Sequence, residues 1–293
     1  MLRISQVAPM KSVAIVTDST ADLPPERARE LDIHVAPLVV HIDGESFEDG
    51  TELTPAGFYE KLSLAKGIPS TSQPAVGRFR ELFEAIPQKD IVSIHISSGL
   101  SGTWNSARLA AEQTPGKRIR VLDSASVSLA VGYPAQTAAQ AAAAGADFEQ
   151  VCSLAEQSIA RTGFFAILDT LQFARRSGRL GFAQALIGSM LQVKPIITIA
   201  AGSVQPVDRP RTMRKALDRL VELTAKRAPF DELAVLHANN HVLAAELAGR
   251  LAAFHGRSID VVCTGAVIGS HCGPGAVATA FQSQSSVTSL KSN

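Results

Sequence analysis

A cluster of hydroxyl side chains between residues 95 and 111 is the first candidate for chemistry in this sequence. The segment reads HISSGLSGTWNSARLAA and contains five hydroxyls and two glycines, namely Ser97, Ser98, Gly99, Ser101, Gly102, Thr103 and Ser106. It lies between an apolar run and an alanine-rich helical pattern, so the N-terminus of a helix would add unpaired N–H groups. Such a corner favours a carboxylate or a phosphate. The alternative is ordinary helix capping by one serine, with the others incidental.

Covalent chemistry at this corner would need more than a serine. A P-loop requires GxxxxGK[ST] with its lysine, and a nucleophile elbow requires GxSxG. Ser101 lies in Leu-Ser-Gly and has neither spacing. A catalytic arrangement would bring a serine, a base and an orienting acid into contact. Ser97 or Ser98, His271 and Asp18 could supply these parts, and the sequence leaves open whether they meet.

A second hydroxyl group and a basic turn could serve the same ligand. The segment PSTSQP, 69–74, precedes a helical pattern, so Thr71 or Ser72 could cap that helix or face the ligand of the first cluster. The segment RRSGRLG, 175–181, predicts a solvated turn or an anion-binding or partner surface.

A histidine in the glycine-rich segment GSHCGPGA, 269–276, is the third candidate. We expect a loop before a helix, with Pro274 near the helix start. In that setting His271 could donate to an anion or act as a general base, or its ring could simply fill space. His271 and Cys272 belong to no HxxxH or CxxC pair, so no metal site is predicted.

The composition limits the class of protein. The chain has 293 residues, 46% of them hydrophobic, and a formal charge of +1 from 28 basic and 27 acidic residues. This allows two packed domains and disfavours nucleic acid as a partner. Three cysteines without a CxxC pattern indicate a reducing compartment. The first ten residues lack the apolar core of a signal peptide, and no apolar run reaches the ~20 residues of a membrane helix. We therefore expect a cytoplasmic protein.

Strands and helices alternate in the first half of the chain. Apolar runs at 13–16, 90–96 and 118–122 predict buried strands, and 33–44 predicts one further extended segment. This alternation is typical of a parallel sheet covered by helices, in which ligands bind beyond the carboxyl ends of strands. An alanine-rich helical pattern is interrupted near Gly132 and Pro134. The sequence predicts an N-terminal parallel-sheet α/β domain over residues 11–162.

The second half mixes a hairpin with helix-flanked strands. The hairpin is predicted at 193–212, with Gly202 and Ser203 at its turn. We expect a C-terminal α/β domain with a mixed, partly antiparallel sheet over residues 163–282. A mobile polar tail is expected at 283–293.

Seven of these segments together resemble the DegV family of bacterial fatty-acid-binding proteins. In the family's order they are VTDSTADLP (16–24), TSQP (71–74), HISSGLSGT (95–103), VLDSASVS (121–128), RRSGRLG (175–181), KPI (194–196) and GSHCGPGA (269–276). Each motif is short, but the ordered set is specific and covers nearly the whole chain. The sequence departs from the family at Ala75-Val76, where Ser-Pro is common, and at Trp104, where Tyr is usual.

The resemblance implies a long-chain fatty acid buried between the two domains, without a cofactor or metal. Its acyl tail would run into an apolar tunnel, where each buried CH2 contributes ~0.8 kcal/mol. Scattered apolar residues would line that tunnel, such as Phe164, Phe165, Ile167, Leu186 and Met190. Hydroxyls would hold the carboxylate without attacking it. The implied ligand contacts are Thr71 or Ser72, Ser97 or Ser98 beside Gly99, and His271.

The resemblance also implies a carrier that is not itself an enzyme. Family members that serve as the binding subunit of a fatty acid kinase present the carboxylate to a separate ATP-binding protein. The product is an acyl phosphate for phospholipid synthesis. Arg179 matches the arginine that the family associates with this partner, and a monomer is expected. From the residues alone, a serine/histidine-dependent acyl hydrolase and a small-anion sensor stay open as alternatives.

Overall fold

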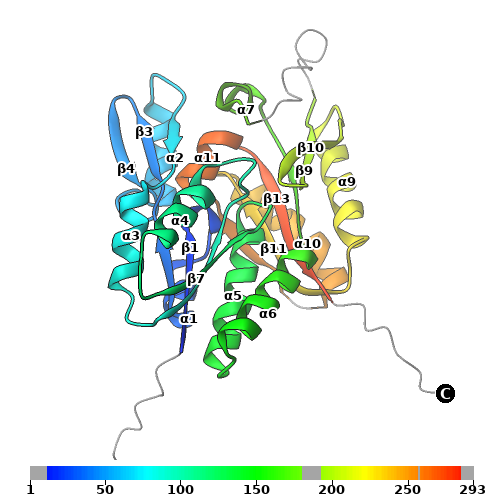
Figure 1. The fold of residues 1–293 in the computed structure, drawn as a ribbon. Helices are drawn as coiled ribbons and strands as arrows, with labels where there is room; N and C mark the ends of the chain where they lie inside the picture. Colours follow the sequence, from blue (N-terminus) through cyan, green and yellow to red (C-terminus); the bar gives the residue numbers. More distant parts are fainter. Residues whose placement is uncertain (1–11, 180–192, 257, 285–293) are drawn as a thin grey trace, which may run out of the picture.

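Two large sheets and one small sheet organise the described part of the chain (Figure 1). The computed structural model describes residues 12–179, 193–256 and 258–284. The first large sheet is parallel, in the order β2-β1-β6-β7, as predicted for the first half. Its strands are β1 (Val13–Asp18), β2 (Ile33–Ala36), β6 (Asp90–His95) and β7 (Arg118–Asp123).

Alternating side chains of β1 bury both faces of this sheet. Val13 and Ile15 pack on one face, and Ala14 and Val16 pack on the other. The helices on the first face are α5 (Leu129–Ala143) and α6 (Phe148–Arg161), and those on the second are α3 (Val76–Ala85) and α4 (Thr103–Glu112). The short helices η1 (Ser19–Ala21) and α1 (Pro25–Leu31) lie between β1 and β2 in the chain. The burial of both faces explains why these strands read as continuous apolar runs.

The alanine-rich helix α5 is continuous, so the predicted interruption near Gly132 and Pro134 is wrong. Proline removes one backbone hydrogen bond from the helix. Against that loss, ten of the fifteen residues of α5 are buried. The helix packs on α6, on β1 and on strands of the second large sheet. Gly132 permits the approach of η1, because a Cβ there would lie 3.0 Å from the Ala21 carbonyl oxygen.

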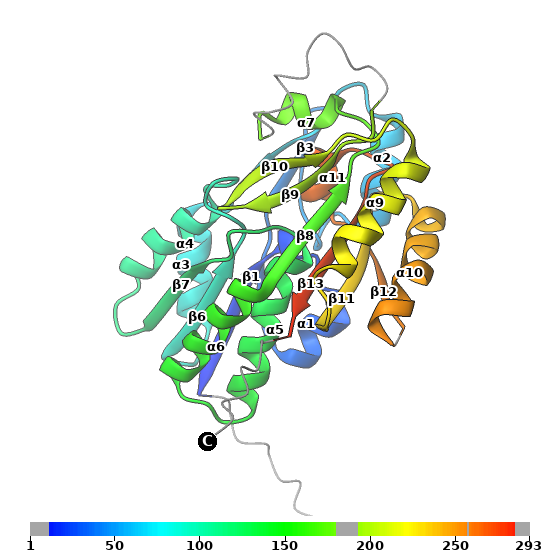
Figure 2. The same cartoon turned by 90° about the vertical axis from the view of Figure 1, so that its right-hand side faces the viewer.

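The second large sheet is mixed, as predicted, in the order β10-β9-β8-β13-β11-β12. Neighbouring strands are antiparallel, except for the parallel pair β11 and β12. They are β8 (Thr162–Ile167), β9 (Ile196–Ala200), β10 (Ser203–Asp208), β11 (Phe230–His237), β12 (Asp260–Cys263) and β13 (Val277–Ser283). The outer face is covered by α9 (Met213–Ala225) and α10 (His241–His255) (Figure 2). Its inner face turns toward the first half of the chain.

A small antiparallel sheet, β4-β3-β5, adjoins the parallel sheet. It consists of β3 (Val39–Ile42), β4 (Glu45–Glu48) and β5 (Ser70–Ser72), with α2 (Pro55–Leu64) between β4 and β5. The single extended segment predicted at 33–44 is therefore wrong. It forms two strands of different sheets, because Pro37 lies between β2 and β3 and offers no backbone donor.

The hairpin of β9 and β10 forms as predicted, but its turn is one residue earlier. Ala201 and Gly202 occupy the turn, both with positive φ. The mixed sheet begins at Thr162, close to the predicted domain limit, and the limits of the two domains stay a prediction. Most of the predicted tail, 285–293, lies outside the described residues, as do Leu186 and Met190.

Candidate functional site: a cavity between the two large sheets

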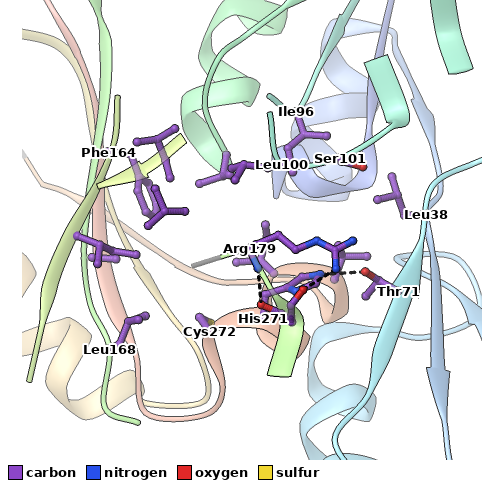
Figure 3. Close-up of a pocket in the computed structure, with 18 of the residues that line it drawn as sticks. Leu38, Thr71, Ile96, Leu100, Ser101, Phe164, Leu168, Arg179, His271 and Cys272 are labelled. Atoms are coloured by element: carbon purple, nitrogen blue, oxygen red, sulfur yellow. Dashed lines mark hydrogen bonds between the residues drawn. The ribbon is translucent and has the colours of Figure 1, made fainter. Parts of the chain in front are cut away.

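A cavity lies between the two large sheets (Figure 3). Most of its wall is apolar, and both halves of the chain contribute to it. The apolar lining is Leu38, Ile96, Leu100, Val127, Phe164, Ala166, Leu168, Ile197, Ile199, Val204, Val267, Ile268 and Cys272. The polar lining is Thr71, Gln73, Ser101, Ser177, Arg179 and His271. A long apolar wall with a small polar group is typical of a site for an amphipathic small molecule.

Thr71 and His271 meet at the polar part of the cavity. Thr71 Oγ1 and His271 Nε2 are 2.9 Å apart, although 200 residues separate them in the sequence. Burial, and then the charge of Arg179, lower the pKa of His271 to about 4. The imidazole of the ligand-free protein is therefore neutral at pH 7. His271 Nδ1 is buried and has no hydrogen-bond partner among the described residues.

His271 lies in the last turn of a helix, α11 (Ala266–Cys272), and not in a loop before a helix. The prediction from GSHCGPGA is wrong because Gly273, with φ +74°, ends that helix and β13 follows. Gly269 lets α11 approach α2 closely, since a Cβ there would lie 2.6 Å from Phe58 and 2.7 Å from the Tyr59 hydroxyl. Close packing therefore fixes the helix that carries His271.

Two buried carboxylates hold the other end of α11. The N–H of Gly265 donates to Asp22 at 2.8 Å, and the N–H of Ala266 donates to Asp49 at 3.0 Å. Burial raises the pKa of Asp22 to about 7 and that of Asp49 to about 6. Both carboxylates come from the first half of the chain. They tie the histidine-bearing helix to the parallel-sheet half.

The serine corner, Ser97–Gly99, contacts the β9–β10 turn. The Ser97 hydroxyl is buried and donates to the Gly202 carbonyl oxygen at 2.6 Å, and it accepts from the Gly99 N–H at 3.1 Å. A Cβ on Gly99 would lie 2.6 Å from the Gly202 oxygen, so this glycine allows the approach of another backbone. Ser98 is exposed, and its N–H donates to Asp123. The structure thus places Ser97, Ser98 and Gly99 outside the cavity lining.

Ser72 also lies away from the cavity. Neighbouring residues of a strand point to opposite faces, and Ser72 Oγ is 3.1 Å from His41 Nε2 on the exposed side of the small sheet. The structure therefore brings Thr71 and His271 together and leaves the other four predicted ligand contacts elsewhere. It adds Ser101, which belongs to the hydroxyl cluster recognised in the sequence.

Arg179 lies at the rim of the cavity, exposed and close enough to lower the pKa of His271. Its guanidinium donates to the Ser177 carbonyl oxygen at 2.6 Å. In Figure 3 its side chain runs between His271 and Leu100. Sequence reasoning gave this arginine a role toward a partner. Its position also puts a positive charge at the polar group.

Alternation along β8 separates the predicted tunnel residues. Phe164 lines the cavity, together with Ala166 and Leu168. Phe165 and Ile167 lie in the core on the outer face. The period of two would have made this distinction from the sequence.

The predicted catalytic residues do not meet. Ser97 is bonded to Gly202, His271 to Thr71, and Asp18 accepts from His95 Nδ1 at 2.9 Å. The other ring nitrogen of His95 is 2.6 Å from Ser93 Oγ, which completes an Asp-His-Ser arrangement that the sequence reasoning missed. All three side chains have 0% exposure, so no substrate reaches them. This network joins the ends of β1 and β6.

Clusters of metal-ligating side chains and membrane-spanning helices are both absent from the described part of the chain. Residues 12–179, 193–256 and 258–284 contain no group of three or more His, Cys, Asp or Glu side chains that could hold a metal ion. Within the same ranges, no helix has the length and apolar character needed to cross a membrane.

Comparisons with known proteins agree on one family. The family described as "Uncharacterised protein, DegV family" matches residues 12–284. A DegV domain-containing protein of Streptomyces coelicolor is 37% identical over 282 residues, covering 94% of this chain and 99% of that protein. The structure of DegV from Bacillus subtilis, described as a fatty acid binding protein, matches with a TM-score of 0.85 and 34% identity, covering 94% of this chain and 100% of that one. A DegV family protein of Thermus thermophilus, whose structure is described by its fatty acid binding, also gives a TM-score of 0.85, at 32% identity, with 93% and 100% covered.

Proposed function

The chain belongs to the DegV family, and we propose that it binds one long-chain fatty acid in the cavity between its two large sheets. The observation that carries this proposal is the uneven wall of the cavity, apolar over most of its length and polar around Thr71 and His271. Burial of the tail contributes ~0.8 kcal/mol per CH2, so the tail supplies most of the affinity. The Bacillus subtilis and Thermus thermophilus relatives, both described as binding fatty acids, support the same ligand.

The carboxylate would be held by Thr71, His271, Ser101 and Arg179. The Thr71 hydroxyl donates to the carboxylate, and its oxygen accepts the single N–H of the neutral His271 imidazole, at Nε2, so His271 acts by orienting that hydroxyl. Arg179 supplies the positive charge that a half-buried carboxylate requires. Ser97 would serve this site indirectly, by holding the β9–β10 hairpin that carries part of the apolar wall.

The second part of the proposal is a role as the binding subunit of a fatty acid kinase. The chain would present the carboxylate to a separate ATP-binding protein. Transfer of the γ-phosphoryl group of ATP to a carboxylate oxygen would give an acyl phosphate and ADP, for use in phospholipid synthesis. Support comes from the position of Arg179, which is exposed at the rim and adjoins the polar end of the cavity. This chain would supply binding and orientation, without a catalytic residue of its own.

Denaturing extraction of the purified protein, followed by mass spectrometry, tests the ligand. We expect a near-stoichiometric fatty acid. An empty extract, repeated after incubation with a panel of fatty acids, would overturn the proposal. Release of a small anion without an acyl tail would favour the sensor. Turnover of an activated acyl ester without ATP would favour the hydrolase.

Adjacent residues of β5 provide a matched test of the polar site. Thr71→Val removes the hydroxyl that meets His271 while keeping the shape of the side chain. We expect a roughly 10- to 150-fold loss of fatty acid affinity, because one hydrogen bond to a charged group is worth ~1.5–3 kcal/mol. Ser72→Ala, on the exposed face, should change the affinity less than twofold. Equal losses in both variants would place the carboxylate elsewhere.

Two arginines near α7 (Gln172–Ser177) test the kinase role. Arg179→Ala should slow ATP-dependent acyl phosphate formation, measured after addition of the ATP-binding subunit, while most of the lipid stays bound. Arg176→Ala is the control, since Arg176 is exposed in the last turn of α7, three residues before Arg179, and does not line the cavity. Loss of all lipid from the Arg179 variant would remove the role toward a partner.

A further inference from the structure

Asp22 and Asp49 form a buried carboxylate pair around the residue that precedes α11. A Cβ on Gly265 would lie 3.1–3.3 Å from Asp22 Oδ1 and from both carboxylate oxygens of Asp49, so the two side chains converge on one point. Asp22 is 8% exposed and Asp49 is 3% exposed. Neither carboxylate forms an ion pair with another described residue. Two acidic groups therefore face each other in a place closed to water, with only N–H and hydroxyl donors beside them.

The surroundings of the pair make its full ionisation costly near neutral pH. Burial gives Asp22 a pKa of about 7 and Asp49 a pKa of about 6, so together they hold about one proton near pH 6.5. Burial also raises the pKa of each neighbouring phenol and thiol, and these groups stay neutral at pH 7. The ionisable side chains that face the pair are Asp18 of β1, Tyr59 of α2, Cys263 of β12 and Cys272 of α11.

The helix α11 has this pair at one end and the proposed carboxylate site at the other. The pair accepts the N–H groups of Gly265 and Ala266, and His271 lies in the last turn. The six residues from Gly265 to His271 span about 9 Å. Four of the seven residues of α11 are buried, so little water lies between the two ends. Like charges about 10 Å apart, at an effective dielectric constant of about 20, change an equilibrium about tenfold. Arg179 at the rim offsets part of this repulsion.

We propose that the Asp22–Asp49 pair couples fatty acid binding to proton uptake: a carboxylate that binds at the far end of α11 draws a proton onto the pair. The inference rests on the proposed fatty acid site at Thr71 and His271. Below about pH 6 the pair is largely protonated and repels the ligand least. Above about pH 8 both carboxyls are ionised, and the affinity should be about three- to tenfold lower.

The test measures palmitate affinity from pH 6 to pH 8.5 in the delipidated wild type, Asp22→Asn, Asp49→Asn and Asp123→Asn. Palmitate's own titration is common to all four proteins, so the ratio of wild-type to variant affinity isolates the pair. For Asp22→Asn we expect this ratio to fall about three- to tenfold across the range. Asp123→Asn is the matched control and should follow the wild type, because Asp123 also accepts backbone N–H groups but from Ser98 and Ala125, away from α11.

A direct measurement needs no variant of Asp22. In ¹³C NMR titrations of the wild type, the carboxyl midpoints of the pair should rise by about 0.5–1 pH unit when palmitate is bound. Asp49→Asn assigns the two signals by removing one of them. Thermal unfolding checks that each variant folds, and if Asp22→Asn does not fold, these midpoints decide the matter.

The outcomes separate this inference from the function on which it depends. If the wild type binds no palmitate at any pH, the fatty acid proposal fails and the proton coupling fails with it. If palmitate binds but the affinity ratio is flat and the carboxyl midpoints do not move, the coupling alone is overturned. An equal change of the ratio in Asp123→Asn would also overturn it, because the net charge of the protein would then explain the effect.

Discussion

Replacement of Ser97 by alanine separates two roles for the serine corner. If Ser97 holds the carboxylate, its loss weakens binding and leaves the ligand-free protein unchanged. If it holds the hairpin, as its hydrogen bond to Gly202 indicates, its loss destabilises the ligand-free protein. Ser98 is the matched control, since it is adjacent, exposed and chemically identical.

The expected magnitude follows from the burial of both partners. The Ser97 side chain has 0% exposure, and Gly202 is also buried. Without the hydroxyl, the Gly202 carbonyl oxygen would lose its donor in a place closed to water. Leaving one buried polar group unsatisfied costs about 1–3 kcal/mol. Ser98→Ala should stay within about 0.5 kcal/mol of wild type, as exposed substitutions do.

Urea unfolding of the delipidated proteins measures this difference. The midpoint should fall for Ser97→Ala and stay in place for Ser98→Ala, with the slope m unchanged in both. A fatty acid should restore part of the lost stability by mass action, because it binds only the folded protein. A Ser97→Ala variant that unfolded like the wild type and yet bound fatty acid at least tenfold more weakly would contradict the structural role of Ser97. That result would place Ser97 in direct contact with the ligand.

Three further predictions concern titration and packing. The pKa of Asp22 is raised, so the folded protein keeps a proton that the unfolded chain has lost, and the free energy of unfolding should fall as pH rises from about 4 to about 7. In Asp22→Asn most of this fall should disappear, and the urea midpoint at pH 8 should be higher than that of the wild type. In NMR titrations of the ligand-free protein, the His271 ring should titrate near pH 4 instead of near 6.5, and Arg179→Gln should raise that midpoint; a midpoint near 6.5 in the unchanged protein would contradict the burial of the ring. Gly269→Ala should destabilise the fold and weaken fatty acid binding together, because its methyl group would collide with Phe58 and displace α11; thermal unfolding and a binding assay on one sample check this.

Local patterns were sufficient to predict the architecture of the two halves. Apolar runs marked three of the four parallel strands, β1, β6 and β7. The errors have tertiary causes. Pro134 stays inside a helix because α5 is buried between two sheets. Gly273 ends α11, so the glycine-rich segment 269–276 contains the end of a helix, where the sequence predicted a loop before one. Such outcomes depend on neighbours that sequence spacing does not reveal.

The candidate site was predictable in its residue types and less so in its contacts. Thr71 and His271 were identified from the sequence, but only the fold shows that they touch. Ser97 carries the same chemistry and lies in the most conspicuous cluster, yet its hydroxyl is bonded to a hairpin more than 100 residues away. A hydroxyl cluster in a sequence shows that polar groups must be satisfied at that corner. It does not show whether a ligand or the chain itself satisfies them.

The contacts that form the site also join the two halves of the chain. Ser97 holds the turn of β9 and β10, while Asp22 and Asp49 hold the start of α11. In each case the first half contributes the side chain and the second half contributes the backbone group. The cavity lies between these connections and takes its wall from both halves. Separation of the sheets would break these hydrogen bonds and expose the apolar wall in the same event. A bound acyl chain adds apolar contacts to both halves, so binding of the tail and closure of the two sheets should be thermodynamically coupled.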